Sequence, residues 1–338
     1  MDIDFVIPWV DGSDPEWRKN KNKYSGEIDE PIDTTEERYR DWDILKYWFR
    51  GVEKFAPWVH KIYFVTCGQR PEWLNEKHKK LVLVNHEDYI PHEYLPTFSA
   101  NPIELNFHRI KDLSEHFVYF NDDMFITSKV KPGDFFRNNL PCDMAVEDPI
   151  SPNKQDVFMH LLLNNMILLN SQYDRRKVLK QQWKKFYLVK DKKALMMNWS
   201  FFLWRRHDFF GLEYSHLPSS YLKSTYEKVW KENEQLLNCV SGNRFRSVED
   251  VNQYIFKNEQ LVTGKFSPYN WRKNGKAFHM NDGDSSENNI EEMCQAIERG
   301  TYKMICVNES EVEHFEETKQ KVIQAFEVLL SEKSEFER

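Results

Sequence analysis

The chain has 338 residues, of which 40% are hydrophobic and 30% charged, a composition typical of a globular protein with one large or two ordinary domains. Its formal net charge of −7 argues against a broad nucleic-acid-binding surface, because such a surface requires an excess of Lys and Arg. The five cysteines include no Cys-X-X-Cys pair, which favours reduced thiols. The sequence has no run of about 18 apolar residues of the kind that forms a transmembrane helix. We therefore expect a cytoplasmic protein whose membrane contact is at most peripheral, at the inner face of the cell membrane.

The first predicted strand covers residues 4–10 and is followed at once by a turn that contains Asp11, Gly12 and Asp14. Many nucleotide-binding α/β domains begin with a strand that ends at a glycine turn. An ordinary Asp-Gly turn has the same sequence, so both interpretations stay open at this point. The charged segment 16–32 predicts a surface loop.

Residues 44–52 carry apolar side chains at helical spacing and predict an amphipathic helix. Short apolar runs at residues 61–66 and 81–86 predict two further strands. This alternation predicts an α/β fold with a doubly wound, mostly parallel sheet of the GT-A-like or Rossmann-like kind and an inserted, mainly helical region.

A helix is predicted to open at residues 97–104 and to run to Leu113. On that helix Glu104 and His108 would lie at i and i+4 on one face, next to Arg109. The pair fits a functional site and a plain surface pair equally well.

The next apolar run, residues 117–125, contains Asn121, Asp122 and Asp123 and has the pattern of a buried strand with acid at its end. Ligands of open α/β sheets bind outside the carboxyl ends of strands, where two carboxylates can hold a hard divalent cation against a phosphate group. An Asx turn or a helix N-cap is the alternative, because Asn and Asp favour both.

Two helices are predicted after this run, at residues 157–169 and 172–193, and the second is strongly basic. A basic helix can meet an anionic polymer or a membrane surface. A solvated helix face explains the same charges.

His216 precedes Pro218 in a segment whose pattern predicts a helix to about Cys239. Pro favours the first turn of a helix, so His216 would lie near a helix N-terminus, where the backbone dipole favours anions and a neutral imidazole. Arg246 likewise precedes a predicted helix that runs through Phe256.

The final segment predicts a strand at residues 303–307, a cap at 308–310 and an amphipathic helix at 312–330. An apolar strand here again ends in Asn and an acid, as it does at residues 121–123.

Four groups of short motifs, in this order along the chain, carry a resemblance to a known family. They are residues 3–15; residues 38–41, 99–104, 108–110 and 121–123; residues 216–218, Arg246 and residues 249–250; and residues 305–309. They resemble the conserved blocks of the Stealth proteins, bacterial capsular polysaccharide phosphotransferases related to the lysosomal-enzyme N-acetylglucosamine-1-phosphotransferase. The chain departs from the family pattern at Ser219, where a second His is usual, and at Glu309, where Asp is usual.

The resemblance implies transfer of a hexose- or N-acetylhexosamine-1-phosphate from a UDP-sugar donor to a hydroxyl of an oligosaccharide or polysaccharide acceptor, which can be lipid-linked. The product is a phosphodiester linkage in a capsular or cell-surface polysaccharide, with release of UMP. The implied cofactor is Mg²⁺, with Mn²⁺ as a substitute, and no nucleic-acid partner is implied.

The resemblance also implies catalytic roles. Asp122 and Asp123 would bind the metal, and His216 would be the general base. Arg246 and Arg109 would clamp phosphate, and Asp11 would be a second acid near the reacting phosphorus. The implied substrate-binding residues are Gly12, Asp14, Asn101, His108, Arg109 and Asn121.

Three regions follow from this assignment: a nucleotide-sugar-binding α/β core at 1–150, a mainly helical acceptor region at 151–260 that contributes catalytic residues, and a strand and helix at 261–338 that complete the core. A metal-dependent glycosyltransferase that releases UDP would use the same Asp-Asp pair. A non-catalytic glycan-binding module is a third interpretation, which rests on the 11 Trp residues.

Overall fold

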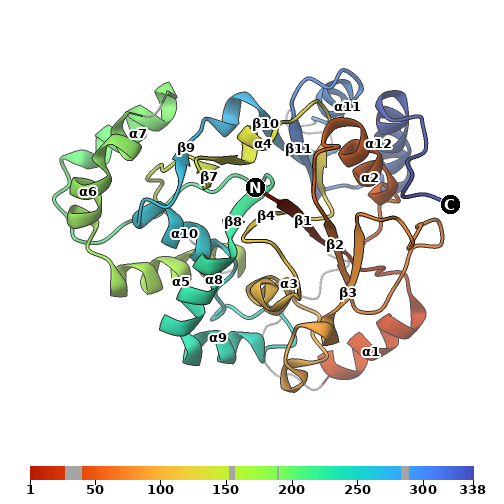
Figure 1. Cartoon of the computed structure of the whole chain (residues 1–338), viewed down its shortest axis with the longest axis horizontal. Helices are drawn as coiled ribbons and strands as arrows, with labels where there is room; N and C mark the ends of the chain where they lie inside the picture. Colours follow the sequence, from red (N-terminus) through yellow and green to blue (C-terminus); the bar gives the residue numbers. More distant parts are fainter. Residues whose placement is uncertain (27–39, 152–156, 189, 283–288) are drawn as a thin grey trace.

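A five-stranded sheet lies at the centre of the computed structural model, which describes residues 1–26, 40–151, 157–188, 190–282 and 289–338 (Figure 1). Four of its strands are parallel, and the fifth, β8, pairs antiparallel with β4. In spatial order the strands are β3 (Leu81–Asn85), β2 (Ile62–Thr66), β1 (Ile3–Pro8), β4 (His116–Tyr119) and β8 (Ser219–Leu222). The predicted α/β fold with a mostly parallel sheet is confirmed.

Helices cover both faces of this sheet, and the alternating side chains of β1 show how. Phe5 and Ile7 pack on one side, while Val6 packs on the other, because successive side chains of a strand point to opposite faces. The first side is covered by α2 (Leu45–Phe55), whose Trp48 and Phe49 pack on Phe5 and Phe64. The same apolar core extends to α11 (Ile290–Glu298) and α12 (Phe315–Leu329), which pack on each other and on a second sheet. The second side is covered by α3 (Ala100–Leu105), α8 (Lys223–Glu232), α9 (Glu234–Ser241) and α10 (Tyr254–Val262).

A second sheet joins the C-terminal segment to the middle of the chain. Its strand order is β10 (Gly275–Asn281), β11 (Met304–Glu311) and β5 (Met124–Ile126). β11 runs parallel to β10 and antiparallel to β5, with Cys306 opposite Met124. This pairing brings the end of the chain next to the Asn-Asp-Asp segment.

The strand predicted over residues 117–125 is therefore two strands in two sheets. β4 ends at Tyr119 and β5 begins at Met124, so Asn121, Asp122 and Asp123 form the link between them. The predicted cap at 308–310 is also wrong, because β11 continues to Glu311 along β10 and α12 begins only at Phe315.

Three further local predictions fail for identifiable reasons. Residues 16–25 belong to α1 (Pro15–Ser25) and do not form a loop, because Asp14 caps the helix and Pro15 fits its first turn. The rest of the predicted loop, residues 27–32, lies outside the described residues. The segment after Pro218 begins with strand β8, whose partner β4 is distant in sequence. α10 begins at Tyr254, so Arg246 lies in the preceding loop and not at a helix start.

A helical region with a small third sheet extends beyond β8, on the left of Figure 1. The Arg175 guanidinium, which is buried, donates to both carboxylate oxygens of Glu147 at 2.5 and 2.8 Å and ties this region together. The elements are α4 (Pro132–Phe135), β6 (Phe136–Arg137), β7 (Leu140–Asp143), α5 (Val157–Gln172), α6 (Arg175–Tyr187), α7 (Lys192–Phe202) and β9 (Ser267–Pro268). Short 3₁₀ helices are η2 (His86–Asp88), η3 (His92–Tyr94), η4 (Phe107–Arg109) and η5 (Trp271–Lys273).

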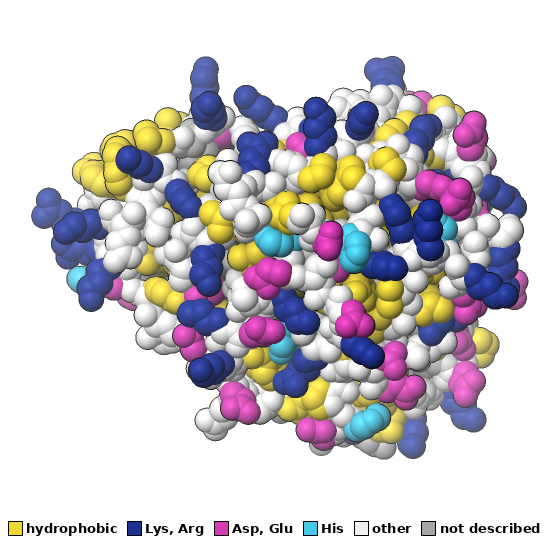
Figure 2. Space-filling model, in the orientation of Figure 1, with side chains coloured by type: hydrophobic (Ala, Val, Ile, Leu, Met, Phe, Trp, Pro, Cys, Tyr) yellow, Lys and Arg dark blue, Asp and Glu magenta, His cyan; other side chains and the backbone are white. Residues whose placement is uncertain are grey.

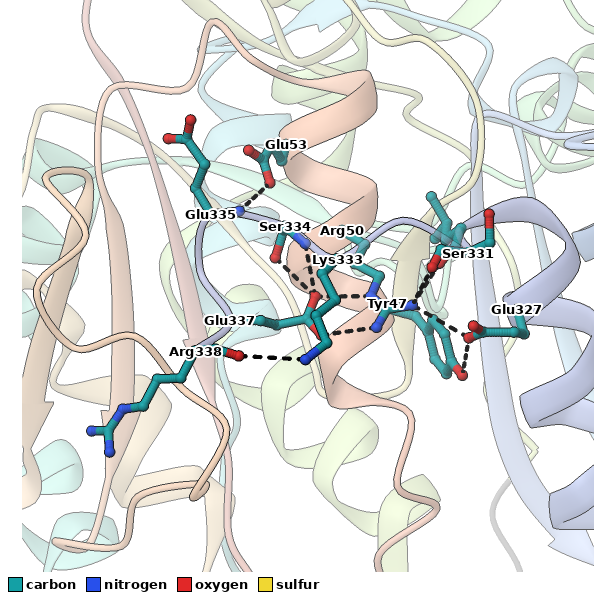
Figure 3. A network of polar contacts seen from close by, with 11 residues as sticks. Tyr47, Arg50, Glu53, Glu327, Ser331, Lys333, Ser334, Glu335, Glu337 and Arg338 are labelled. Carbon is teal, nitrogen blue, oxygen red and sulfur yellow. Dashed lines mark hydrogen bonds and ion pairs between the residues drawn. The ribbon is translucent and has the colours of Figure 1, made fainter.

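The C-terminal tail is held against α2 by a buried arginine (Figure 3). The Arg50 guanidinium donates to both carboxylate oxygens of Glu337 at 2.8 Å and to the Leu330 carbonyl at 2.8 Å. The Tyr47 hydroxyl, one turn earlier, donates to Glu327 at 2.7 Å. The tail thus packs on the N-terminal part of the chain.

The three predicted region boundaries stay a prediction. Within the described residues, no helix is both long and apolar enough to span a bilayer.

Candidate active site

A cleft of about 1540 Å³ opens along the edge of the main sheet where the parallel strands end. Its wall contains the residues that follow β1, β2, β3 and β4, and also those that precede the antiparallel strand β8. This is the edge at which open α/β sheets bind ligands. Ligand sites commonly have volumes of roughly 300–1,000 Å³, so the cleft is large enough for more than one small ligand.

Asp123 lies at the centre of the polar groups in this cleft. Its Oδ2 accepts hydrogen bonds from Cys306 Sγ and Asn308 Nδ2, both at 3.2 Å, across the β5–β11 pairing. Its Oδ1 is buried and has no hydrogen-bond partner among the described residues. A buried carboxylate oxygen without a partner is costly, so this oxygen is suited to a bound cation.

His216 faces Asp123 from the segment before β8. Its Nε2 lies 3.6 Å from Asp123 Oδ2 and 3.5 Å from Asn121 Nδ2, and its side chain is half-buried. No helix begins at Pro218, so the predicted helix dipole does not act on His216. Pairing of β8 with β4 places the imidazole at the sheet edge instead.

Three carboxylates gather on the same wall: Asp41, Asp122 and Asp123. The Asp122 side chain is reached by solvent within the cleft, but many protein atoms surround it. The resulting loss of hydration, together with repulsion from Asp123 and Asp41, raises the pKa of Asp122 to about 7. Burial, the larger cause, and repulsion from Asp43 and Asp11 also raise the pKa of Asp41. Carboxylates that oppose one another's ionisation without a cation fit a divalent-metal site.

Asp123, His216 and Cys306 also place possible ligand atoms within 4.8 Å of one another. Burial and the neighbouring carboxylates raise the pKa of the Cys306 thiol well above its ordinary value, so Cys306 remains a protonated donor to Asp123. Hard cations such as Mg²⁺ prefer oxygen ligands. The residues that fit such a cation are therefore Asp122 and Asp123, with Asp41 nearby.

Behind Asn121 lies a buried chain of polar contacts. The Tyr119 hydroxyl contacts Glu104 at 2.5 Å and also the Asn121 side-chain oxygen. Burial raises the pKa of Glu104 to about 7, against the opposing effects of Tyr119 and Arg246. A protonated Glu104 can donate to Tyr119 while Tyr119 donates its single proton to Asn121, which holds Asn121 beside His216.

Cationic side chains line the rest of the cleft. Arg40 pairs with Glu309 at 2.7 Å, and the Trp42 indole N–H donates to the other oxygen of Glu309 at 2.9 Å. Arg246 lies close enough to Glu104 and Asp250 to act on their ionisation. The other lining cations are Lys193, Arg272 and Lys276. Arg40, Arg272 and Lys276 already pair with carboxylates, so a pyrophosphate bound among these cations would compete with those pairs for their charge.

Two of the predicted substrate-binding residues have structural partners. Asn101 lines the cleft, but its amide donates to Asp250 at 2.8 Å, and Asp250 also accepts from the Ser247 N–H at 3.0 Å. Asn101 thus anchors the loop that carries Arg246. Asp14 accepts from the N–H groups of Glu16 and Trp17 as the cap of α1 and from Gln69, whose hydrogen bond lowers the pKa of Asp14 most.

Asp11, Gly12 and Asp14 lie beside the cleft and are not among the described residues that form its wall. The Asp11 carboxylate accepts from Ser13 at 2.6 and 2.8 Å, and Asp11 acts on Asp41 electrostatically. Trp9 and Val10, which directly precede this turn, do line the cleft.

His108 and Arg109 lie away from the cleft wall that the described residues form. His108 is packed between Tyr226 and Trp230, and burial lowers its pKa to about 3, aided by Arg109 and Lys223. The Arg109 guanidinium lies over the Trp230 ring, 4.6 Å from its centre. The predicted helix to Leu113 would have placed His108 on the face of Glu104, but α3 ends at Leu105 and a 3₁₀ turn follows.

Four residues of the cleft wall had no role predicted from the sequence: Arg40, Asp41, Asn308 and Glu309. All four belong to the family motifs at residues 38–41 and 305–309. Arg38 and Tyr39, in the first of these motifs, lie outside the described residues. The signal was present as polar residues in short, unusual motifs. Their function needed the pairing of β11 with β5, because only that pairing places Asn308 at Asp123.

Comparisons with known proteins agree on one family. Residues 38–143 match Stealth protein CR2, conserved region 2, and residues 1–29 match Stealth protein CR1, conserved region 1. The chain is 40% identical over 338 residues to the capsular polysaccharide phosphotransferase WcwK of Streptococcus pneumoniae, covering 99% of this chain and 98% of that protein. It is 41% identical to the receptor polysaccharide phosphotransferase WefC of Streptococcus oralis, covering 99% of each.

A third relative comes from another genus. The exopolysaccharide phosphotransferase cps2G of Lactiplantibacillus plantarum is 37% identical, with 100% of this chain and 97% of that protein covered. Such identity over nearly the whole length of each protein shows common descent and a shared fold. The chain belongs to the Stealth family, and it is a phosphotransferase.

Proposed function

We propose that this enzyme transfers a hexose- or N-acetylhexosamine-1-phosphate from a UDP-sugar to a hydroxyl of an acceptor glycan, which can be lipid-linked. The product is a phosphodiester in a bacterial capsular or cell-surface polysaccharide, and UMP is released in the cytoplasm. The WcwK, WefC and cps2G relatives are named as polysaccharide phosphotransferases, which supports polysaccharide as the acceptor class.

The observation that carries the proposal is the convergence of two groups at the sheet edge: an Asp123 oxygen that has no hydrogen-bond partner among the described residues, and the His216 imidazole. Phosphoryl transfer needs a group that accepts the proton of the attacking hydroxyl and fixed charges that stabilise the transferring phosphoryl group. The cleft supplies the first from His216 and the second from its arginines.

Each residue has a definite task in this scheme. His216 Nε2 takes the proton of the acceptor hydroxyl while that oxygen forms a bond to the sugar-bearing phosphorus. The bridging P–O bond breaks, and its electron pair leaves on UMP. Asp123, 3.6 Å from Nε2, stabilises the imidazolium that results. Arg246 and Arg40 neutralise the pyrophosphate.

Mg²⁺ or Mn²⁺ fits the carboxylate wall. Asp122 and Asp123 would hold the ion, because Asp123 Oδ1 is unpartnered among the described residues and the pKa of Asp122 is raised by its acidic neighbours. When bound, the ion supplies positive charge to the pyrophosphate oxygens.

The test is to incubate the purified enzyme with a UDP-N-acetylhexosamine, UDP-hexose or both, an acceptor glycan and Mg²⁺, and to identify the nucleotide released. UMP that appears only with acceptor supports the proposal. UDP would show glycosyl transfer instead, and glycan binding without nucleotide release from either donor would favour a binding module.

A matched pair of variants connects the reaction to the site. His216→Gln and Asp123→Asn should lower the rate of UMP release by about a hundredfold or more, whereas the exposed controls His92→Gln and Asp2→Asn should leave it unchanged. Full UMP release by both site variants would contradict the site assignment while leaving the reaction itself in place.

A further inference from the structure

The outer surface of α7 and the end of α6 carries a group of exposed apolar side chains, named here the docking surface. Its members are Trp183, Leu188, Met196, Trp199, Phe202 and Leu203, of which Trp183 is 46% exposed and Leu203 80%. Figure 2 shows hydrophobic side chains gathered over α7, at the upper left. Large apolar residues exposed together are unusual on a soluble surface and mark interaction sites.

The docking surface is continuous rather than scattered. Met196 and Trp199 lie at i and i+3 on one face of α7, and the C-cap residue Leu203 follows at i+7. The Trp199 and Phe202 rings are 5.2 Å apart, and both contact Tyr187 at the end of α6, at 5.2 and 5.6 Å. Tyr187 is buried beneath them, so α6 and α7 share one apolar area.

Many positive side chains lie beside this area. Segment 173–208 contains eleven Lys and Arg and three Asp, a net charge of +8, in a chain whose net charge is −7. Figure 2 shows Lys and Arg over α6, at the left edge beside the apolar group. The exposed cations are Arg176, Lys177, Lys180, Lys184, Lys190, Lys192, Lys193, Arg205 and Arg206.

This combination selects among possible partners. A solvated helix face explains the lysines but not exposed Trp, Phe and Leu. A second copy docked through the same face would bring +8 against +8, and like charges oppose such a symmetric contact. An anionic bilayer matches both components, because Trp and Phe favour the interface and Lys and Arg favour its phosphates.

We propose that the docking surface binds the surface of an anionic lipid bilayer. Trp199, Phe202 and Leu203 enter the boundary between headgroups and acyl chains. The surrounding Lys and Arg contact lipid phosphates.

The docking surface is attached to the rim of the cleft. Asp191 caps the N-terminus of α7 and pairs with Arg272 at 2.6 Å, and Arg272 also pairs with Glu213. Arg272 and Lys193 both line the cleft. A bilayer bound at α7 therefore lies next to one end of the cleft. The suggestion that this end receives a lipid-linked acceptor rests on the proposed function. The binding of the bilayer itself does not.

Vesicle co-sedimentation of the full chain tests the proposal. We expect binding to vesicles of equimolar phosphatidylcholine and phosphatidylglycerol at low salt, and much weaker binding to pure phosphatidylcholine. The triple variant Trp199→Ser, Phe202→Ser and Leu203→Ser should lower the partition coefficient by more than about tenfold. Val328→Ser, on α12 and 62% exposed, is the apolar control and should bind as the wild type does.

A second variant set isolates the charge. Lys177→Glu, Lys180→Glu and Lys184→Glu should also lower binding by more than about tenfold. The control carries the same charge change at three exposed lysines elsewhere, Lys77→Glu, Lys79→Glu and Lys111→Glu, and should keep most of the binding. Thermal unfolding confirms that each variant is folded, and UMP release with a water-soluble acceptor should be the same as in the wild type.

Three results would overturn the proposal. The first is wild-type protein that stays in the supernatant with anionic vesicles. The second is a triple Ser variant that binds like the wild type, which would reduce the contact to nonspecific charge attraction. The third is light scattering that shows a wild-type dimer and a monomeric triple Ser variant, which would assign the docking surface to a second copy of the chain.

Discussion

His216 Nε2 lies 3.6 Å from Asp123 Oδ2, although the two residues lie at the ends of two different strands of the main sheet. Asp123 follows β4, and His216 precedes β8, which runs antiparallel to β4. Antiparallel pairing puts the end of one strand beside the start of the other, so both side chains reach the same edge. This relationship joins a candidate base to a candidate metal ligand and sets the first tests.

Replacement of Asp123 by Asn should lower kcat by about 10²–10³-fold or more, because the change removes the charge at the centre of the site. Asn keeps the shape of the side chain, so the thermal midpoint should change little. Initial rates of UMP release and a melting curve measure the two effects. A variant that melts like the wild type and also turns over like it would remove Asp123 from the site.

Replacement of His216 by Gln should lower kcat by about 10²–10⁴-fold, the usual contribution of a general base, and leave KM for the donor near its wild-type value. The imidazole acts on the acceptor hydroxyl and not on donor binding. Steady-state kinetics with varied donor concentration separate the two parameters. A raised KM with normal kcat would instead make His216 a donor-binding residue.

Divalent metal should stabilise the protein through Asp122 and Asp123. At a hundredfold excess over Kd the free energy of unfolding should rise by about 2.7 kcal/mol, and chelation should reverse the effect. Binding displaces the proton of Asp122, whose pKa is raised to about 7, so affinity should increase from pH 6 to pH 8. Titration calorimetry at both pH values measures this, and Asp122→Asn should flatten the pH dependence.

Glu104 should make stability fall as pH rises. Its pKa in the folded protein is raised from 4.5 to about 7, so between these values the folded state keeps a proton that the unfolded state has lost. Raising the pH through this window therefore favours unfolding, by on the order of 3 kcal/mol. Urea titrations of the metal-free wild type and Glu104→Gln at several pH values should show a smaller loss in the variant; equal slopes would contradict the assignment.

Replacement of Arg50 by Met should destabilise the protein by about 3–5 kcal/mol, because it leaves the Glu337 carboxylate buried without its partner. Lys46→Met, on the same helix, should cost much less, because Lys46 forms no ion pair among the described residues. Urea unfolding measures both, and a double variant with Glu337→Gln should recover part of the loss. Equal effects of the two single substitutions would argue against the clamp shown in Figure 3.

Local pattern predicted the elements whose apolar side chains form one regular run. β1, β2 and β3 were found near their true bounds because buried strands appear as continuous apolar runs, and α2 was found because its apolar side chains recur at helical spacing. The pattern failed at residues 117–125 and 216–222. Apolar periodicity cannot tell where a strand changes sheet or whether a Pro begins a helix or precedes a strand.

The sequence by itself determined the family, the α/β class and the candidacy of Asp122, Asp123 and His216, because these depend on motifs that are contiguous in the chain. Only the tertiary structure decided which residues share the cleft. Pairing of β11 with β5 brought Cys306 and Asn308 to Asp123, and packing under Trp230 took His108 and Arg109 away from the cleft wall. Pairing and packing depend on complementary surfaces from distant segments, and no single segment encodes its partner.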